Sequence, residues 1–212
     1  NISAHDLPIQ EPDEFYKQQA DGPLKNYTAI GRDDRERSYF LRMFLGCARA
    51  ADYLASRPDW DGRTLAVTGN SQGGLQALVT AALRPQLVSA VMVNVPAGCD
   101  HNAAAAGRAA GWPFHLGGDA DAAVRGAVRY FDGAHFAARV ACPALVGLGL
   151  IDTVSRPDGI FAAVNAMRGP VETVVMPAYG HQGRHEPYQQ RFGAWKSALV
   201  AGMAAPAGEA GP

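Results

Sequence analysis

Apolar positions recur at two spacings along the chain, and each spacing predicts a different kind of element. Between residues 40 and 54, apolar side chains return every three or four positions, which is the spacing of one face of an α-helix. Elsewhere the apolar residues form short continuous runs bounded by Gly or Pro, as in strands that are buried on both faces of a sheet. Such strands are expected at 64–68, 88–95, 144–150 and 171–176.

Helical segments separate these predicted strands. Alternating strands and helices are typical of an α/β fold, in which helices cover both faces of a mostly parallel sheet. Pro58 and Pro85 end two of the helices, and Asp33 and Asp34 are expected at the N-terminus of the first long one, where negative charge is favourable. Further helices are expected near Phe15 and at 75–83, 157–167 and 187–203, with some helix at 122–130 inside an otherwise irregular segment, 97–140.

Composition and charge narrow the class of protein. The chain has 212 residues, 48% of them apolar, which is enough for one globular domain, expected over residues 1–204. Residues 205–212 are rich in Ala, Gly and Pro and are expected to be a disordered tail. A net charge of −1 with scattered basic residues argues against a nucleic-acid partner, and no apolar run is long enough to span a membrane.

The chain has three widely spaced cysteines, Cys47, Cys99 and Cys142. An odd number without a close pair predicts thiols in the core rather than a disulfide framework. The cysteines therefore leave the cellular compartment open.

Residues 69–73 read Gly-Asn-Ser-Gln-Gly and match the pattern Gly-x-Ser-x-Gly. The motif follows a predicted strand and opens a predicted helix, so Ser71 would lie on a sharp turn with strained backbone angles and an exposed hydroxyl. The flanking glycines are expected because neighbouring backbone passes too close for side chains. We predict that Ser71 is a nucleophile; the alternative is a serine that only caps a helix.

A serine nucleophile needs a base, and the base needs an acid to orient it. In folds that carry this turn, the acid follows a later strand and the histidine follows the last one. Asp152 lies just past the strand at 144–150 and is the predicted acid, with Asp158 and Asp100 as alternatives. A role for Asp152 in a turn or a helix cap is also open.

Two histidines follow the last predicted strand. His181 comes at once, after a glycine that lets the loop turn, and is the predicted base. His185 is the alternative, and it is otherwise expected to be a solvated residue at a helix start. A metal site made by this pair lacks a third ligand at a suitable spacing. The other histidines have no motif around them and are expected to be structural or exposed: His5, His101, His115 and His135.

The backbone N–H of Gln72, the residue after the nucleophile, is the expected first donor to an oxyanion. The second donor normally comes from a loop that follows an earlier strand. Residues 1–63 contain no clear strand, so the second donor is expected to lie outside this chain.

Several segments together resemble the acetyl xylan esterase and cephalosporin C deacetylase family (carbohydrate esterase family 7). The most specific is Gly-Asn-Ser-Gln-Gly-Gly at 69–74, which looks like the family's Gly-x-Ser-Gln-Gly-Gly turn. The resemblance extends over roughly residues 35–200 and is carried further by 49–58, 95–100, 150–154 with Pro157, and 179–181.

This resemblance implies an α/β-hydrolase fold and a serine esterase that removes acetyl groups from xylose oligomers or similar small esters. It implies Ser71, Asp152 and His181 as the catalytic triad and Gln72 as the oxyanion donor, with no metal and no cofactor. Its implied partners are an acetylated sugar and, in a ring-like homo-oligomer, copies of the same chain. The near-neutral charge and the short apolar runs separately predict that neither nucleic acid nor a membrane is a partner.

Two features depart from the family's pattern. The family's Gly-His-Glu reads Gly-His-Gln at 180–182, and its upstream Arg-Gly-Gln segment is not present. We therefore expect an N-terminally truncated version of a longer enzyme, with the early strands missing. The rival functions are a short-chain esterase or serine peptidase of the same fold, and a truncated remnant that does not turn over.

Overall fold

The computed structural model describes residue 5 and residues 7–115 and 120–202. The strands are β1 (Ala66–Asn70), β2 (Ala90–Asn94), β3 (Ala144–Gly149) and β4 (Val171–Met176). The helices are α1 (Asp13–Asp21), α2 (Tyr39–Ser56), α3 (Gln72–Leu83), α4 (Ala122–Val128), α5 (Gly133–Ala137), α6 (Pro157–Ala166) and α7 (Glu186–Val200), with 3₁₀ turns at Tyr27–Ala29, Ala104–Ala106 and Arg129–Phe131.

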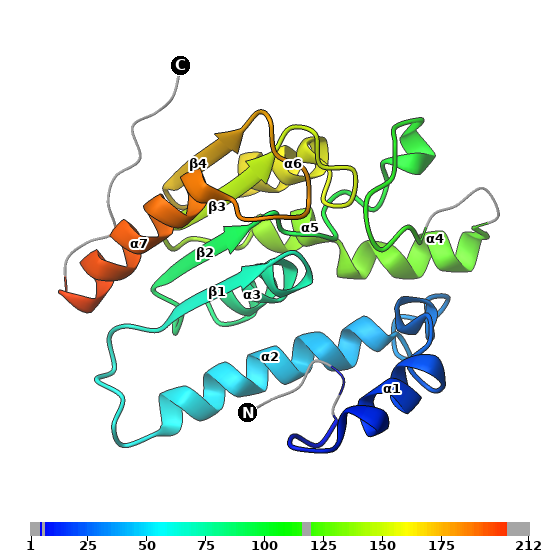
Figure 1. Cartoon of the computed structure of the whole chain (residues 1–212), viewed down its shortest axis with the longest axis horizontal. Helices are drawn as coiled ribbons and strands as arrows, with labels where there is room; N and C mark the ends of the chain where they lie inside the picture. The colour runs from blue at the N-terminus through cyan, green and yellow to red at the C-terminus, as the bar shows by residue number, and fades with distance from the viewer. Residues whose placement is uncertain (1–4, 6, 116–119, 203–212) are drawn as a thin grey trace.

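The four described strands form one parallel sheet in the order β1-β2-β3-β4 (Figure 1). Their register places Asn70 opposite Asn94, and Asn94 opposite Gly147. Since all strands run the same way, their carboxyl ends lie along one edge of the sheet. In open α/β sheets that edge is where ligands bind.

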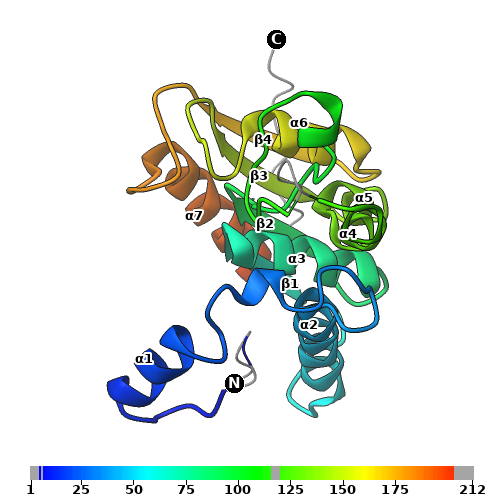
Figure 2. The same ribbon diagram turned by 90° about the vertical axis from the view of Figure 1, so that its right-hand side faces the viewer.

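Alternate residues of the central strands pack into two apolar clusters on opposite faces. On one face, Val91, Val93 and Val146 pack with α3 and α6. On the other face, Met92 and Leu145 pack with Tyr188 and Trp195 of α7. Figure 2 shows α7 on one side of the sheet and α3 on the other. The expected α/β class, with a parallel sheet covered on both faces, is confirmed.

Helix α2 lies outside α3 and forms a further apolar layer with it (Figure 1). Phe40, Met43 and Phe44 of α2 are buried against Leu75 and Val79 of α3. The helix spacing seen between residues 40 and 54 is therefore the spacing of its buried face. Helix α1 has no buried residue.

Several details differ from expectation. Strand β1 covers residues 66–70 rather than 64–68, and it is half-buried rather than buried because it is an edge strand of the described sheet. The N-cap of α2 is Ser38, whose side chain accepts a hydrogen bond from the Phe40 N–H. Asp34 instead stabilises the preceding turn, where it accepts from the N–H of Glu36. Helix α5 was not expected at all.

Other expectations agree with the structure or lie outside it. All three cysteines are free thiols. Within residues 5, 7–115 and 120–202, none of the helices combines the length and the apolar character that a bilayer crossing requires. The tail expected at 205–212 lies outside the described residues, and the single-domain boundary at 204 stays a prediction.

Candidate active site

Ser71 lies at the junction between β1 and α3 in a conformation that non-glycine residues rarely adopt. Its φ is 54° and its ψ is −120°. The junction is held because the Ser71 N–H donates to the carbonyl oxygen of Asn94, at 3.0 Å, and the Ser71 carbonyl oxygen accepts from the N–H of Ala97, also at 3.0 Å. The Ser71 side chain caps no N–H of α3, so the helix-capping alternative does not describe it.

Close packing at this turn requires two glycines, but they are not the pair that the motif predicts. A Cβ at position 69 would overlap the carbonyl of residue 73, and a Cβ on Gly74 would lie 2.9 Å from the Cα of Pro96. At Gly73, a Cβ would meet no described atom within 4 Å. The expectation for Gly73 was therefore wrong. The second tight contact falls one residue later, where α3 passes the loop after β2.

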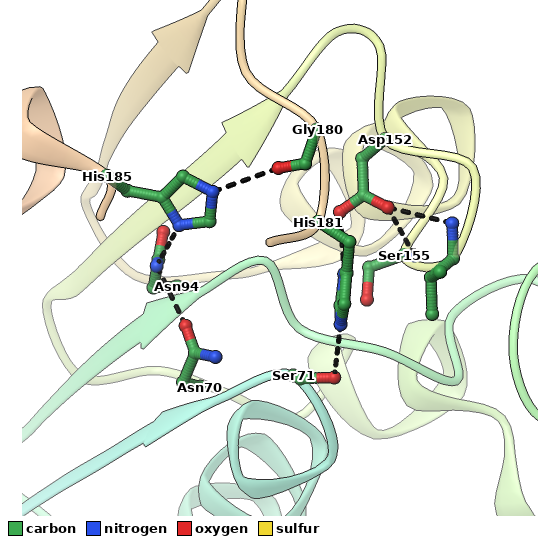
Figure 3. A network of polar contacts seen from close by, with 9 residues as sticks. Asn70, Ser71, Asn94, Asp152, Ser155, Gly180, His181 and His185 are labelled. Carbon is green, nitrogen blue, oxygen red and sulfur yellow. Dashed lines mark hydrogen bonds and ion pairs between the residues drawn. The ribbon is translucent and has the colours of Figure 1, made fainter. Parts of the chain in front are cut away.

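The three residues predicted as nucleophile, base and acid lie in one hydrogen-bonded row (Figure 3). The Ser71 Oγ lies 2.9 Å from His181 Nε2, and His181 Nδ1 lies 2.9 Å from Asp152 Oδ2. Residues 71, 152 and 181 come from three separate loops at the carboxyl edge of the sheet, after β1, β3 and β4. This row can remove the proton of a serine hydroxyl.

Asp152 is held rigidly. Its side chain has 0% exposure, whereas the His181 side chain retains 12%. The N–H groups of Val154 and Ser155 donate to Asp152 Oδ1 at 2.8 and 2.9 Å. Both backbone donors bind the same oxygen, which leaves Oδ2 for His181.

The alternative acids lie elsewhere. Asp100 pairs with Arg108, and Asp158, in the first turn of α6, lies 3.3 Å from the Arg156 Nε. Among the candidates, Asp152 is the one that the structure brings to His181.

His185 is not the solvated helix-start residue that its sequence context predicts. Its exposure is 2%, and it occupies the N-cap position of α7. Its Nδ1 lies 2.7 Å from Asn94 Nδ2, and its Nε2 lies 2.9 Å from the carbonyl oxygen of Gly180. Neither His185 nor Asn94 carried a sequence signal for this arrangement, because residues 94 and 185 meet only through the tertiary fold.

Gln72 is the first residue of α3 and directly follows Ser71, so its N–H has no acceptor within the helix. Its side chain points away to other partners. The Tyr27 hydroxyl donates to Gln72 Oε1, and Gln72 Nε2 lies 3.1 Å from the Met43 sulfur. Partial burial raises the pKa of Tyr27 above its usual value. Sequence reasoning missed this role of Tyr27.

Part of the irregular segment 97–140 runs beside the loop that carries Asp152. The Trp112 N–H donates to the Val154 carbonyl at 2.8 Å, and the Gly98 N–H donates to the Trp112 carbonyl at 3.1 Å. The Trp112 ring packs edge-on against Phe40, at 5.7 Å between centroids. Trp112 is therefore a packed residue that ties the segment to the site.

Two of the other histidines are buried together. His101 and His115 contact each other edge to face, with centroids 5.7 Å apart, and His115 also packs against Phe40. Burial, helped by the nearby His101 and Arg32, lowers the pKa of His115 to about 3. His135 is exposed, and residue 5 lies against Tyr27 and Tyr39.

A family model and a curated relative both place this chain among acetyl esterases. Residues 10–199 match the model of the family described as acetyl xylan esterase (AXE1). Over 184 residues, 85% of this chain, the sequence is 35% identical to the acetyl esterase Axe7A of Xylanibacter ruminicola.

Solved structures agree with this assignment. The acetyl xylan esterase of Paenibacillus sp. R4 is 30% identical over 78% of this chain, with a TM-score of 0.68. Acetyl xylan esterase 1 of Thermoanaerobacterium sp. JW/SL YS485 is 27% identical over 79%, with a TM-score of 0.66. Est1E of Butyrivibrio proteoclasticus, 18% identical with a TM-score of 0.56, shares the fold alone.

The match covers this chain more fully than it covers the relatives. The chain spans 42% of the length of the Xylanibacter esterase, and 56% and 54% of the two acetyl xylan esterase structures. Family and fold are shared over the matched region.

Proposed function

The chain belongs to the acetyl xylan esterase family, with an α/β-hydrolase fold, and from this premise we propose that it is a serine carboxylesterase. Its substrates are acetylated xylo-oligosaccharides or similar small acetyl esters. The observation that carries the proposal is the row from Ser71 through His181 to Asp152, with both contacts at 2.9 Å. The names of the similar proteins support the acetyl group as the acyl part.

The reaction follows from the direction of these hydrogen bonds. His181 Nε2 takes the proton of Ser71 Oγ as the oxygen attacks the acetyl carbonyl carbon. Asp152 accepts from His181 Nδ1, which keeps Nε2 free to act as the base and stabilises the imidazolium that forms. The N–H of Gln72 donates to the oxyanion of the tetrahedral intermediate.

Two steps then complete the turnover. His181 returns its proton to the sugar oxygen as the bond to the acetyl carbon breaks, and the sugar leaves as an alcohol. A water molecule gives a proton to His181 and attacks the acetyl-serine ester. Collapse of this second intermediate releases acetate and restores the hydroxyl of Ser71.

The test uses a serine-directed organophosphonate followed by mass spectrometry of the intact chain and its peptides. We expect one adduct, on Ser71, in the wild type and none in Ser71→Ala. Ser197→Ala is the matched control, since it removes an exposed serine of α7 and should leave the adduct unchanged. A folded wild type that forms no adduct would contradict the proposal and favour the non-catalytic alternative.

Substrate class is tested next. Acetate release from acetylated xylo-oligosaccharides is compared with amine release from an aminoacyl amide, for the wild type and Ser71→Ala. We expect Ser71-dependent acetate release and no amide hydrolysis. The opposite preference would favour the peptidase alternative. The ring-like homo-oligomer stays a prediction, which sedimentation velocity on the same material checks.

A further inference from the structure

His185 is a buried imidazole in a segment that is otherwise exposed. Residues 182–184 and Glu186 are all exposed, yet His185 has 2% exposure. Burying a polar ring costs free energy unless its nitrogens are hydrogen-bonded, and both nitrogens of His185 have partners. The proposed reaction does not use this ring, so the ring needs a separate explanation.

The directions of the hydrogen bonds around His185 are determined by the Asn94 amide. Asn94 Nδ2 has two hydrogens, which it donates to Asn70 Oδ1 at 2.8 Å and to His185 Nδ1 at 2.7 Å (Figure 3). Because Nδ1 accepts, the ring proton lies on Nε2, which donates to the Gly180 carbonyl oxygen at 2.9 Å. One tautomer of the His185 ring therefore satisfies both hydrogen bonds.

The acceptor of this last bond is close to the proposed base. The carbonyl of Gly180 belongs to the peptide unit that joins Gly180 to His181. A hydrogen bond to it orients the peptide plane from which the His181 side chain departs. At the other end of the network, Asn70 directly precedes Ser71 in the chain. One chain of hydrogen bonds therefore connects the residue before the nucleophile to the residue before the base.

The neighbouring strand and helix α7 confine the space around the Asn94 amide. Asn94 ends β2, is 4% exposed, and lies opposite Gly147 of β3. A Cβ at position 147 would lie 2.5 Å from Asn94 Oδ1 and 2.6 Å from the Tyr188 ring, so the glycine leaves the space that the amide needs. The amide is therefore anchored on a central strand rather than on a loop.

We propose that His185 and Asn94 are positioning residues that hold the His181 loop at the distance from Ser71 that proton transfer requires. The inference rests on the proposed function, since it concerns the base of that reaction. Neither residue touches the substrate in this scheme. Their effect passes through the Gly180 carbonyl to His181.

The test compares two substitutions of His185. His185→Phe keeps a buried ring but removes both hydrogen bonds, whereas His185→Gln keeps an N–H that can reach the Gly180 carbonyl. Asn94→Leu has a similar shape but removes the hydrogen bonds to Asn70 and His185. It tests the same inference if His185→Phe does not fold. Circular dichroism and the unfolding temperature of each variant establish that it is folded.

The first readout is the His181 Nδ1 proton that bonds to Asp152, observed by NMR of ¹⁵N-histidine-labelled protein and assigned by its loss in His181→Gln. It requires no turnover. In His185→Phe we expect this proton to exchange with water about tenfold or more faster than in the wild type, and in His185→Gln within about threefold of it. A folded His185→Phe or Asn94→Leu with the wild-type exchange rate would overturn the inference.

The second readout is hydrolysis of a small acetyl ester. We expect kcat to fall about tenfold or more in His185→Phe with KM within about twofold, because the substrate contacts are unchanged, and to recover in His185→Gln. An unchanged kcat in folded His185→Phe would contradict the positioning role but not the proposed esterase function. If the folded wild type neither hydrolyses esters nor reacts with the organophosphonate, the proposed function is refuted. If the His181 proton nevertheless exchanges faster in His185→Phe than in that wild type, the positioning role is supported.

Discussion

At the residue scale, the site depends on which atoms carry protons. Asp152 Oδ1 is already occupied by two backbone N–H donors, so only Oδ2 is available to His181. A carboxylate there requires a proton on His181 Nδ1, and the neutral ring then has a free electron pair on Nε2, facing Ser71. The buried acid thus selects the tautomer that can act as a base.

Replacing this acid with its amide tests the argument. Asp152→Asn is nearly isosteric, but it can present an N–H to His181 Nδ1 and favour the wrong tautomer. We expect kcat for ester hydrolysis to fall by about 10³–10⁴ while the chain stays folded. Asp158→Asn is the matched control, because this carboxylate pairs with arginines instead, and it should keep kcat near the wild-type value. Equal losses in both variants would contradict the role of Asp152.

At the element scale, the close approach of α3 to its neighbours determines where Ser71 lies. β1 runs directly into α3, so the turn has no room for side chains at positions 69 and 74. The turn also holds Ser71 at a positive φ, which costs free energy that the surrounding packing must offset. In the proposed reaction, Ser71 would attack from the conformation that the turn already holds.

Substitutions at two glycines of the motif test which of them the packing of the turn requires. We expect Gly69→Ala to lower the free energy of unfolding by about 1–3 kcal/mol or more, since the added methyl overlaps the residue 73 carbonyl. Gly73→Ala meets open space inside a helix, so its stability should equal or exceed that of the wild type. Denaturant unfolding measures both. A larger loss for Gly73→Ala would contradict the geometry of the turn.

At the scale of the whole molecule, the described sheet ends at β1, and residues of β1, α2 and α3 line a groove of about 280 Å³. Leu54 of α2 is exposed and lines this groove. An edge strand next to apolar surface favours pairing with other chains. The arrangement therefore predicts concentration-dependent self-association of this chain.

A charge placed on the edge should reduce that association. Thr68 is exposed in the middle of β1, so we expect Thr68→Lys to shift the chain toward monomer in sedimentation velocity. Ser197→Lys adds the same charge on α7, away from the edge, and should have a smaller effect. A wild type that is monodisperse as a monomer at all concentrations would refute the prediction.

The buried histidines make the stability of the whole molecule depend on pH. The pKa of His115 is lowered from 6.5 to about 3, mainly by burial, and burial also lowers that of His101. As pH falls below 6.5 the unfolded chain binds protons that the folded chain does not, so stability is full above 6.5 and is lost toward pH 3.

Each such group contributes a slope of at most about 1.4 kcal/mol per pH unit. We expect His115→Leu to reduce the slope of unfolding free energy against pH in this range. Phe131→Leu, in the apolar cluster with Phe40, should shift the curve without changing its slope. Denaturant unfolding at several pH values measures both, and a His115→Leu curve parallel to the wild type would be contrary evidence.

Local sequence patterns predicted many of the helices and strands. The strand at 171–176 and the helix from 157 followed from apolar runs and proline positions alone, and both are where the pattern predicts them. β1 was misplaced by two residues because Thr64 and Leu65 look like strand residues, whereas the paired register with β2 begins only at Ala66. Register depends on the neighbouring strand, which local sequence does not contain.

What the sequence alone determined is the alternation of strands and helices, the family resemblance and the candidates Ser71, Asp152 and His181, since periodicity and motif spacing are local. The tertiary structure decided which candidates meet, because residues 71, 152 and 181 approach only when parallel strands bring their carboxyl ends to one edge. It also decided the place of His185, whose exposed-looking neighbours predict a solvated ring. Burial and the choice of hydrogen-bond partners depend on how the chain packs. The hydrogen bonds from His185 to Asn94 and to Gly180 therefore have no signature in the sequence.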